Sequence, residues 1–337
     1  MKRIGTMLGL LGLLLAAWGC TFGHTEYPRE QAIRDAWQTL QPSYAGSPYV
    51  LGSEPTLSSP YAAGVLDPGF LTDAVNMVSF VRFLEGVPQD IVLDVYLTAW
   101  AQAGAMLMAV NQSTDRSQTA PGDMGLTLAS LALSSVKYAL IGSGTDLAAS
   151  AATAVRDWVR GGADLSTGQA ASRRWILNPA LYELGVGFAD SPLPTPTFYA
   201  SLEVRNNSRP SIPSWDYVAW PNGDSFPVEF FGPGDPWTIT LNPAEYQVPA
   251  GYQIVVTLSR YFVGPTWTLT YEDTSPAGEY LTVSTDLYGV ASCIIFRPGP
   301  SVVYSAGDWF NVQVTGLHPL HDAPAELSFN VRFFSLD

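Results

Sequence analysis

Three residue types that carry much of protein chemistry are scarce in this chain: 337 residues hold two cysteines, two lysines and three histidines. The cysteines, Cys20 and Cys293, do not form a disulfide framework of the kind that stabilises small secreted domains, so the fold must depend on its hydrophobic core. No histidine lies within residues 70–240. A metal or nucleophilic site built on histidine is therefore excluded from that region.

Charge is also sparse and has one dominant sign. Charged residues make up 14% of the chain, and 16 Lys plus Arg against 30 Asp plus Glu give a net charge of −14. Loss of Lys2 and Arg3 with a cleaved leader would leave 14 against 30, or −16. Such a chain is repelled by phosphate backbones, which excludes nucleic acid as a partner. The negative charge also keeps a chain with 47% hydrophobic residues in solution.

Residues 1–20 have the pattern of an export leader. Lys2 and Arg3 precede an apolar run at 7–17 that is too short to span a bilayer. The run ends in Ala-Trp-Gly-Cys, which resembles a bacterial lipobox, although Trp18 departs from the usual pattern. We expect Cys20 to be lipidated and to anchor the protein to the membrane, since two acyl chains suffice for stable anchoring. Secretion without lipid and an uncleaved anchor remain the alternatives.

The expected location is therefore the cell envelope. Thr21 and Phe22, which follow the cysteine, give no aspartate retention signal. In a cell with two membranes, this favours the outer one.

The rest of the chain divides by composition. Residues 21–69 are rich in proline, serine, glycine and tyrosine, which predicts a tether and a wrapping stretch with one short helix at 29–40. Between 70 and 160, apolar residues recur at helical spacing. The pattern predicts helices over residues 71–82, 91–110, 126–141 and from 145 or 146 to 159. The third of them is apolar nearly all round, so we expect it to be buried.

Strand patterns replace helical ones after residue 190. Apolar and polar residues alternate most clearly at 325–334, which predicts a sheet with one buried face. Several short strands between glycine- and proline-rich turns favour a β-sandwich. The expected strands are 198–204, 237–241, 253–259, 266–271, 292–296, 309–315 and 325–334.

One segment carries a family resemblance. Residues 172–179 read Ser-Arg-Arg-Trp-Ile-Leu-Asn-Pro, and residues 184–189 read Leu-Gly-Val-Gly-Phe-Ala. This pattern is similar to the Gly-His-Arg-Arg-Trp-Ile-Leu-Asn-Pro and Gly-x-Gly motifs of bacterial proteins of the CAP superfamily, the SCP-like extracellular domains. Three further segments match in the same order, at 76–84, 101–111 and 215–237.

The resemblance implies a fold and a domain division. The class is α+β: an α-β-α sandwich CAP domain at 70–240, followed at 241–337 by an all-β sandwich similar to a domain often found behind bacterial CAP domains. Residues 1–20 are then the leader, and residues 21–69 the tether and wrapping segment.

The family's metal cavity is degenerate in this chain. Many CAP domains line that cavity with two histidines and two acidic residues, and the matching histidine positions here are Gln118 and Ser172. The acidic positions fall near Val136 or Lys137 and near Gly161. We therefore expect no metal and no cofactor. Gln118 and Ser172 either form a polar cavity for a neutral ligand or are relic positions that only pack.

Other candidate residues have two interpretations each. Arg173 and Arg174 either grip an anionic head group or have structural roles, one paired with a buried carboxylate and the other exposed. Ser172 would need a neighbouring base to act as a nucleophile. His318 and His321 are a weak alternative metal site, or incidental residues of a surface loop.

The second cysteine and the aromatic residues are further candidates for either a functional or a packing role. Cys293 lies in an apolar run and is expected to be a buried thiol. Five tryptophans either line a carbohydrate or lipid groove or pack in the core. They are Trp215, Trp220, Trp237, Trp267 and Trp309.

Together these features favour an envelope-anchored, non-catalytic protein that binds a lipid-like small molecule, a wall polymer or a protein partner. The alternatives are a hydrolase that uses non-standard cavity residues, and a structural spacer. Fold alone does not choose among them.

Overall fold

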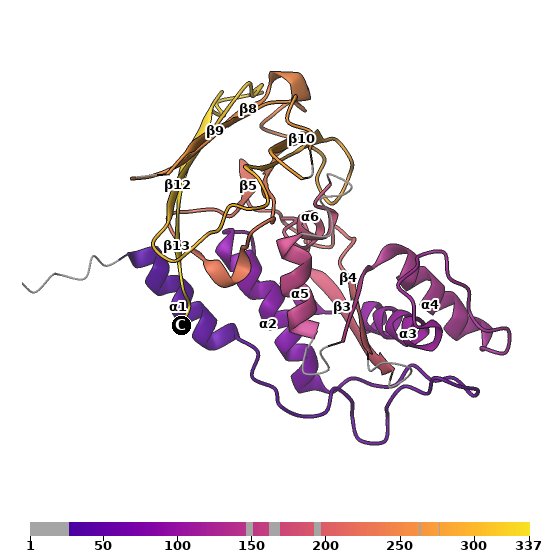
Figure 1. Cartoon of the computed structure of the whole chain (residues 1–337). Helices are drawn as coiled ribbons and strands as arrows, with labels where there is room; N and C mark the ends of the chain where they lie inside the picture. Colours follow the sequence, from indigo (N-terminus) through magenta and orange to yellow (C-terminus); the bar gives the residue numbers. More distant parts are fainter. Residues whose placement is uncertain (1–26, 146–150, 162–168, 192–196, 263, 276) are drawn as a thin grey trace, which may run out of the picture.

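The computed structural model describes residues 27–145, 151–161, 169–191, 197–262, 264–275 and 277–337 (Figure 1). The predicted α+β class is confirmed, with helices in the first half of the chain and mostly strands in the second. The leader and Cys20 lie outside the described residues. Within the described ranges, no helix has the length and apolar character needed to cross a membrane.

The first sheet has four strands and is surrounded by helices. Its order is β1-β3-β4-β2, and only the β1–β3 pair is parallel. The strands are β1 (Val92–Leu93), β2 (Leu140–Gly144), β3 (Glu183–Ser191) and β4 (Thr197–Glu203). The helices are α1 (Pro28–Leu40), α2 (Pro68–Leu84), α3 (Val95–Asn111), α4 (Leu126–Tyr138), α5 (Ala151–Arg160) and α6 (Ala171–Ile176).

Side-chain caps fix where two of the helices begin. The Asp67 carboxylate accepts a hydrogen bond from the Gly69 amide at 2.7 Å, and Pro68 occupies the first turn of α2. The Asp94 carboxylate accepts from the Leu97 amide at 2.7 Å at the start of α3. Both aspartates satisfy backbone donors that have no partner inside the helix.

Helices cover both faces of the first sheet. On one face, Gly187 of β3 lies against the backbone of α3, so that a Cβ atom added there would be 2.1 Å from the Ala101 carbonyl oxygen. On the other face, the Phe188 ring lies 5.0 Å from that of Phe70 in α2. Successive side chains of β3 point to opposite faces of the sheet. The glycines on one face allow the backbone of α3 to lie close to the sheet, whereas large side chains separate α2 from the sheet on the other face.

Two further sheets make up the second part of the fold. Their orders are β10-β11-β7-β5 and β6-β13-β12-β8-β9. The strands are β5 (Tyr217–Trp220), β6 (Phe226–Pro227), β7 (Trp237–Leu241), β8 (Val255–Arg260), β9 (Thr266–Leu269), β10 (Tyr280–Ser284), β11 (Cys293–Arg297), β12 (Trp309–Thr315) and β13 (Leu327–Phe334), and the short 3-10 helices are η2 (Val228–Phe230) and η3 (Gly251–Gln253). Strands β6 and β7 pair with β13 and β11, which come after residue 241, and β5 joins the same sheet through β7. These sheets therefore cross the domain boundary expected at residue 240.

The two sheets pack through an aromatic core that continues into the helical part. Trp237 of β7 lies 5.8 Å from Phe310 of β12 and 6.2 Å from Phe333 of β13, measured between ring centroids. Phe230, in η2, lies 5.3 Å from Phe80 of α2. One hydrophobic core therefore extends from the helices into the β sheets.

Several predicted elements are confirmed at their expected positions. The helix predicted at 29–40 is α1, and the seven predicted strands match β4, β7, β8, β9, β11, β12 and β13 within a few residues. The cap predicted for the fourth helix is Thr145 or Asp146. Asp146 lies outside the described residues, and Thr145 is the last residue described before that gap. The described part of this helix, α5, begins at Ala151.

The prediction for residues 126–141 is wrong in two respects. The helix ends at Tyr138, and Leu140–Gly144 form β2, which pairs with β4. Helix α4 is also not buried on all sides: it buries only Ala132, Ser135 and Val136, and Leu126 is 90% exposed. One edge of β4 pairs with β3, and residues 140–144 pair with the other edge. Their backbone N–H and C=O groups therefore bond to β4 instead of within a longer helix.

Candidate functional site

Arg173 joins the helical part to the β sheets. Its side chain is 1% exposed and extends from α6 toward α5 and β7. The guanidinium donates to the Val159 carbonyl at 2.5 Å and to the Pro236 carbonyl at 2.6 Å, and it also reaches the Thr238 hydroxyl at 3.2 Å. A planar group with five donors is suited to holding several acceptors at once.

Arg174 makes a second connection from the same helix. It is 3% exposed and donates to the Ser284 hydroxyl at 2.9 Å, the Val290 carbonyl at 2.7 Å and the Asp286 carbonyl at 2.5 Å. Burial lowers its pKa, while the nearby Cys293, Tyr288 and Asp286 oppose the shift. These three acceptors are the last residue of β10 and two residues of the loop between β10 and β11, so α6 is attached to this end of the sheet.

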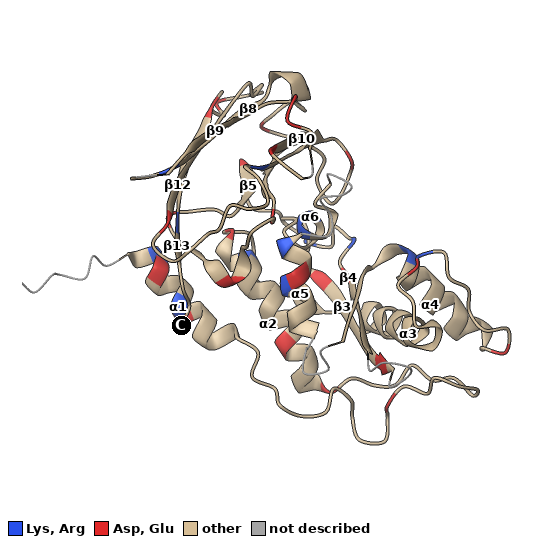
Figure 2. Cartoon of the chain, viewed as in Figure 1, with Lys and Arg blue, Asp and Glu red and all other residues tan. Residues whose placement is uncertain are grey.

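A third buried arginine completes what we call the arginine joint: Arg82, Arg173 and Arg174. Arg82, from α2, is fully buried and donates to the Ile176 carbonyl at 2.7 Å and the Asn178 carbonyl at 2.9 Å. Burial lowers the pKa of Arg82 to about 9. Figure 2 shows that charged residues are sparse along the chain and that α6 carries arginine where the helices meet the β strands.

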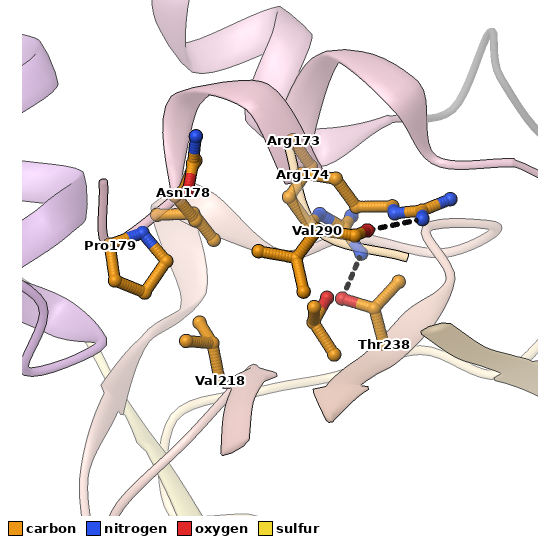
Figure 3. Close-up of a pocket in the computed structure, with 9 residues that line it drawn as sticks. Arg173, Arg174, Asn178, Pro179, Val218, Thr238 and Val290 are labelled. Atoms are coloured by element: carbon orange, nitrogen blue, oxygen red, sulfur yellow. Dashed lines mark hydrogen bonds between the residues drawn. The ribbon is translucent and has the colours of Figure 1, made fainter. Parts of the chain in front are cut away.

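The contacts of the arginine pair agree with structural roles, but not with the expectation that one of the two side chains is exposed. Neither Arg173 nor Arg174 is exposed, and both donate to carbonyl and hydroxyl oxygens. The cavity beside them holds about 10 Å³ (Figure 3). That is roughly the room one water molecule needs, so an anionic head group does not fit. Helix ends and loops leave backbone carbonyls without a donor, and the two arginines supply donors to such carbonyls. Their role is therefore structural.

The two replaced histidine positions lie on different elements. Gln118 is half-buried in the loop after α3 and bonds to that loop: it accepts from Asn111 at 2.8 Å and donates to the Asp115 carbonyl at 2.9 Å. Ser172 is half-buried in α6. The contacts of Gln118 are those of a loop-stabilising side chain.

The weak metal alternative gains no support. His318 is exposed and its Nε2 lies 2.9 Å from Oε1 of Gln253, while His321 is exposed in the same loop. In the described part of the chain, no group of three or more His, Cys, Asp or Glu side chains has metal-binding geometry. Cys293 is confirmed as a buried free thiol, and burial raises its pKa.

The five tryptophans divide between core and surface. Trp220 and Trp237 are almost completely buried, whereas Trp215, Trp267 and Trp309 are half-buried. Trp215 lies in an open groove between the end of α6 and the sheet containing β5 and β7. We call this the junction groove. It is lined by Asn178, Pro179, Ala180, Asn207, Ile212, Trp215, Asn242, Pro243, Leu287, Gly289, Val290 and Ala291.

The chemistry of the junction groove is neutral and largely apolar. It encloses about 330 Å³, within the size range of small-molecule sites, and no charged residue lines it. Leu287 is 71% exposed and Ile212 is 50% exposed, so two large apolar side chains stand open to solvent at its rim. The amide of Asn178 is held by Asn207 at 2.8 Å, and the amide of Asn242 by the Trp215 carbonyl at 2.5 Å.

Sequence reasoning missed this groove, although it singled out Trp215. Its walls come from residues 178–180, 207–215, 242–243 and 287–291, which no periodicity connects. The irregular stretch at 205–216, rich in Asn, Ser and Pro, was the available signal, because binding residues often lie on loops held by a rigid scaffold.

Two of the buried carboxyl groups, those of Glu85 and Glu203, have a raised pKa, and both lie outside the groove. Glu85 is 6% exposed, and neither of its oxygens has a hydrogen-bond partner. Burial raises its pKa well above the usual value, although Arg173 and Arg29 oppose the shift. Burial also raises the pKa of Glu203, at the end of β4, to about 7. Neither group reaches the groove, so neither is placed to act on a ligand there.

Because the pKa values of these two carboxyl groups are raised, we expect the free energy of unfolding to fall as pH rises. Each binds a proton more tightly when folded, so the folded state is favoured below the ordinary pKa of 4.5 and loses that advantage as pH rises through the folded value, about 7 for Glu203. Glu203→Gln should raise the free energy of unfolding at pH 8 by about 3 kcal/mol and flatten its change between pH 5 and 8. Urea denaturation at both pH values measures this.

The matched control for that experiment is the exposed Glu272→Gln, which should change stability by less than about 0.5 kcal/mol at either pH. A wild-type stability that increases from pH 5 to 8 would contradict the burial of protonated carboxyl groups.

Scans of the chain against protein-family models, curated proteins and solved structures returned no match.

Proposed function

We propose that the chain is a degenerate CAP domain followed by an all-β sandwich. Support comes from the helices on both faces of the first sheet and from the Gly-x-Gly segment, whose Gly185 and Gly187 meet the backbone of α3. The Ser-Arg-Arg-Trp segment lies where the helices meet the sheet that contains β7 and β10. Its arginines therefore have a reason to be retained without the metal-binding histidines.

The function that fits best is non-catalytic binding at the cell envelope, with Cys20 as the lipid anchor. One observation carries this proposal: the junction groove is open, sized for a small molecule, mostly apolar and free of charged lining residues. Such a surface favours a neutral, lipid-like ligand over an ion or a charged substrate. A wall polymer and a protein partner are the other candidates.

Nile red, a neutral apolar dye, provides a direct test of the groove. Leu287→Glu places a charge at the rim without disturbing the core, because that side chain is 71% exposed. We expect the dye to bind residues 21–337 and its affinity to fall about tenfold or more in the variant, since a charge is costly beside an apolar ligand. Fluorescence titration measures both affinities.

The control is Leu51→Glu, at a side chain that is 96% exposed and belongs to another part of the chain. Equal dye binding by all three proteins would refute the groove as an apolar site. Native mass spectrometry of residues 21–337, purified without a metal-affinity tag, adds an independent readout. A co-purified lipid-sized mass supports the proposal, whereas a bound transition metal contradicts it and directs attention to His318 and His321.

A further inference from the structure

The turn between β8 and β9 presents a phenylalanine under unusual conditions. Phe262 is 87% exposed, and its backbone has φ of +72°, in the left-handed region. A bulky side chain costs conformational energy there, where glycine or asparagine would be preferred. Exposure of the ring to water costs further free energy. Backbone conformation and hydration therefore both disfavour a phenylalanine here, which directs attention to a contact outside the fold.

A chain of aromatic rings connects this turn to the N-terminal end of the described structure. The Tyr261 ring lies 6.3 Å from the Trp309 ring, which lies 6.2 Å from Tyr27. The Tyr261 amide also donates to the Trp309 carbonyl at 2.9 Å. We call Tyr27, Tyr261, Phe262 and Trp309 the aromatic surface. In Figure 1 the β8–β9 turn and the start of α1 lie on the same side of the molecule.

The position of Tyr27 fixes how far this surface can be from the anchor. Only residues 21–26 separate Tyr27 from Cys20. Fully extended, that stretch reaches roughly 25 Å. If Cys20 carries acyl chains, as the proposed function holds, Tyr27 at one end of the aromatic surface is tethered within that distance of the lipidated residue.

The net negative charge of the chain would oppose contact with any negatively charged surface, but the charges beside the aromatic surface balance each other. Among the described residues, two ion pairs and one cavity beside the aromatic surface contribute three arginines and three acidic residues. One pair joins β8 to the start of β12 at 2.6 Å, a second joins α1 to β13, and the third arginine and aspartate line the cavity below Tyr27 and Trp309. These side chains are Arg29, Glu30, Asp224, Arg260, Asp308 and Arg332. The surface is therefore near neutral, although the whole chain carries −14.

We propose that the aromatic surface docks on the lipid bilayer, with Phe262 inserted among the acyl chains and Tyr261 and Trp309 at the headgroup level. Tyrosine and tryptophan prefer that level because their rings combine an apolar body with a polar group. The contact would fix the orientation of the protein on its anchor. It goes beyond the anchor itself, because the acyl chains attach the protein to the membrane without choosing which face meets it.

Vesicles test this contact in the absence of the anchor. Residues 21–337 include every described residue and start after Cys20. Phe262→Cys can be labelled selectively with an environment-sensitive nitrobenzoxadiazole dye, because Cys293 is fully buried. With vesicles of phosphatidylethanolamine and phosphatidylcholine, we expect the dye to brighten and shift to the blue. The control label at Tyr252→Cys, a site in η3 that is 68% exposed, should not respond.

An unlabelled variant measures the energetic contribution of the ring. Phe262→Ser should reduce co-sedimentation of the protein with the same vesicles by about tenfold, as expected for loss of one buried phenyl group. Tyr252→Ser should leave it unchanged. Equal responses at both labelled sites, or vesicle binding that is the same in wild type and Phe262→Ser, would overturn the proposal.

Two outcomes separate this proposal from others. A concentration-dependent dimer that is lost in Phe262→Ser, with no vesicle binding, would assign the surface to a second copy and overturn bilayer docking. Mass spectrometry of the full chain expressed in a bacterium tests the anchor separately. An unmodified Cys20 together with vesicle binding by residues 21–337 would refute the anchor and leave the docking surface supported.

Discussion

Gly187→Ala is expected to lower the free energy of unfolding by at least about 3 kcal/mol, or to prevent folding. The added Cβ atom would lie 2.1 Å from the Ala101 carbonyl oxygen and 2.6 Å from the Gln102 amide nitrogen. Both are backbone atoms of α3, so no side chain can move aside to make room. The helix would have to separate from β3, and its contacts with the sheet would be lost.

The control for this prediction is Gly122→Ala. No atom lies within 4 Å of a Cβ at that position, and its φ is not in the left-handed region. Reduced freedom of the unfolded chain should leave this variant unchanged or slightly more stable. Urea denaturation measures all three proteins. If Gly187→Ala matched Gly122→Ala, the close approach of α3 to the sheet would be wrong.

Arg173→Met should cost about 4 kcal/mol, since it leaves several buried carbonyls without a donor. The carbonyls of Val159, Arg160 and Pro236 would lose their partner, on both sides of the junction between helices and sheets. The change also removes a positive charge that opposes the raised pKa of Glu85. Thermal and urea denaturation measure the loss.

Arg173→Lys and Arg156→Met complete the experiment. Lysine keeps the charge but presents one compact donor group, so it should recover little of the lost stability. Arg156 lies in α5, the helix whose last carbonyls Arg173 contacts, and its side chain is 42% exposed. Arg156→Met should therefore change stability by less than about 1 kcal/mol. Full recovery by lysine would mean that charge, rather than the shape of the guanidinium, holds the joint.

The strands and the first helix show what sequence pattern can predict. The alternation at 325–334 depends only on the two-residue period of a strand, and it identified β13 with its buried Val331 and Phe333. The burial of Cys293 followed in the same way, from the apolar run around it. The pattern at 126–141 misled because apolar residues at helical spacing do not show whether a neighbouring strand will continue a sheet.

The candidate site was less predictable than the fold. The motif at 172–179 drew attention to the right place, but the positions considered were Gln118 and Ser172, either as a polar cavity or as relic positions that only pack. The structure instead gives that place a water-sized cavity and an adjacent open groove. Buried arginines that serve carbonyl oxygens cannot be distinguished in a sequence from arginines that bind an anion, because the acceptors are backbone atoms that any residue supplies.

The sequence by itself determined the α+β class, the scarcity of histidine and cysteine, the net charge and most strands, because composition and periodicity can be read from the sequence. Only the tertiary structure decided the rest. It brought residues 178–180, 207–215, 242–243 and 287–291 together as a groove, and it placed Tyr27 beside Trp309 and Tyr261. These arrangements depend on how sheets and helices pack across long separations in the chain, which no short window of residues encodes.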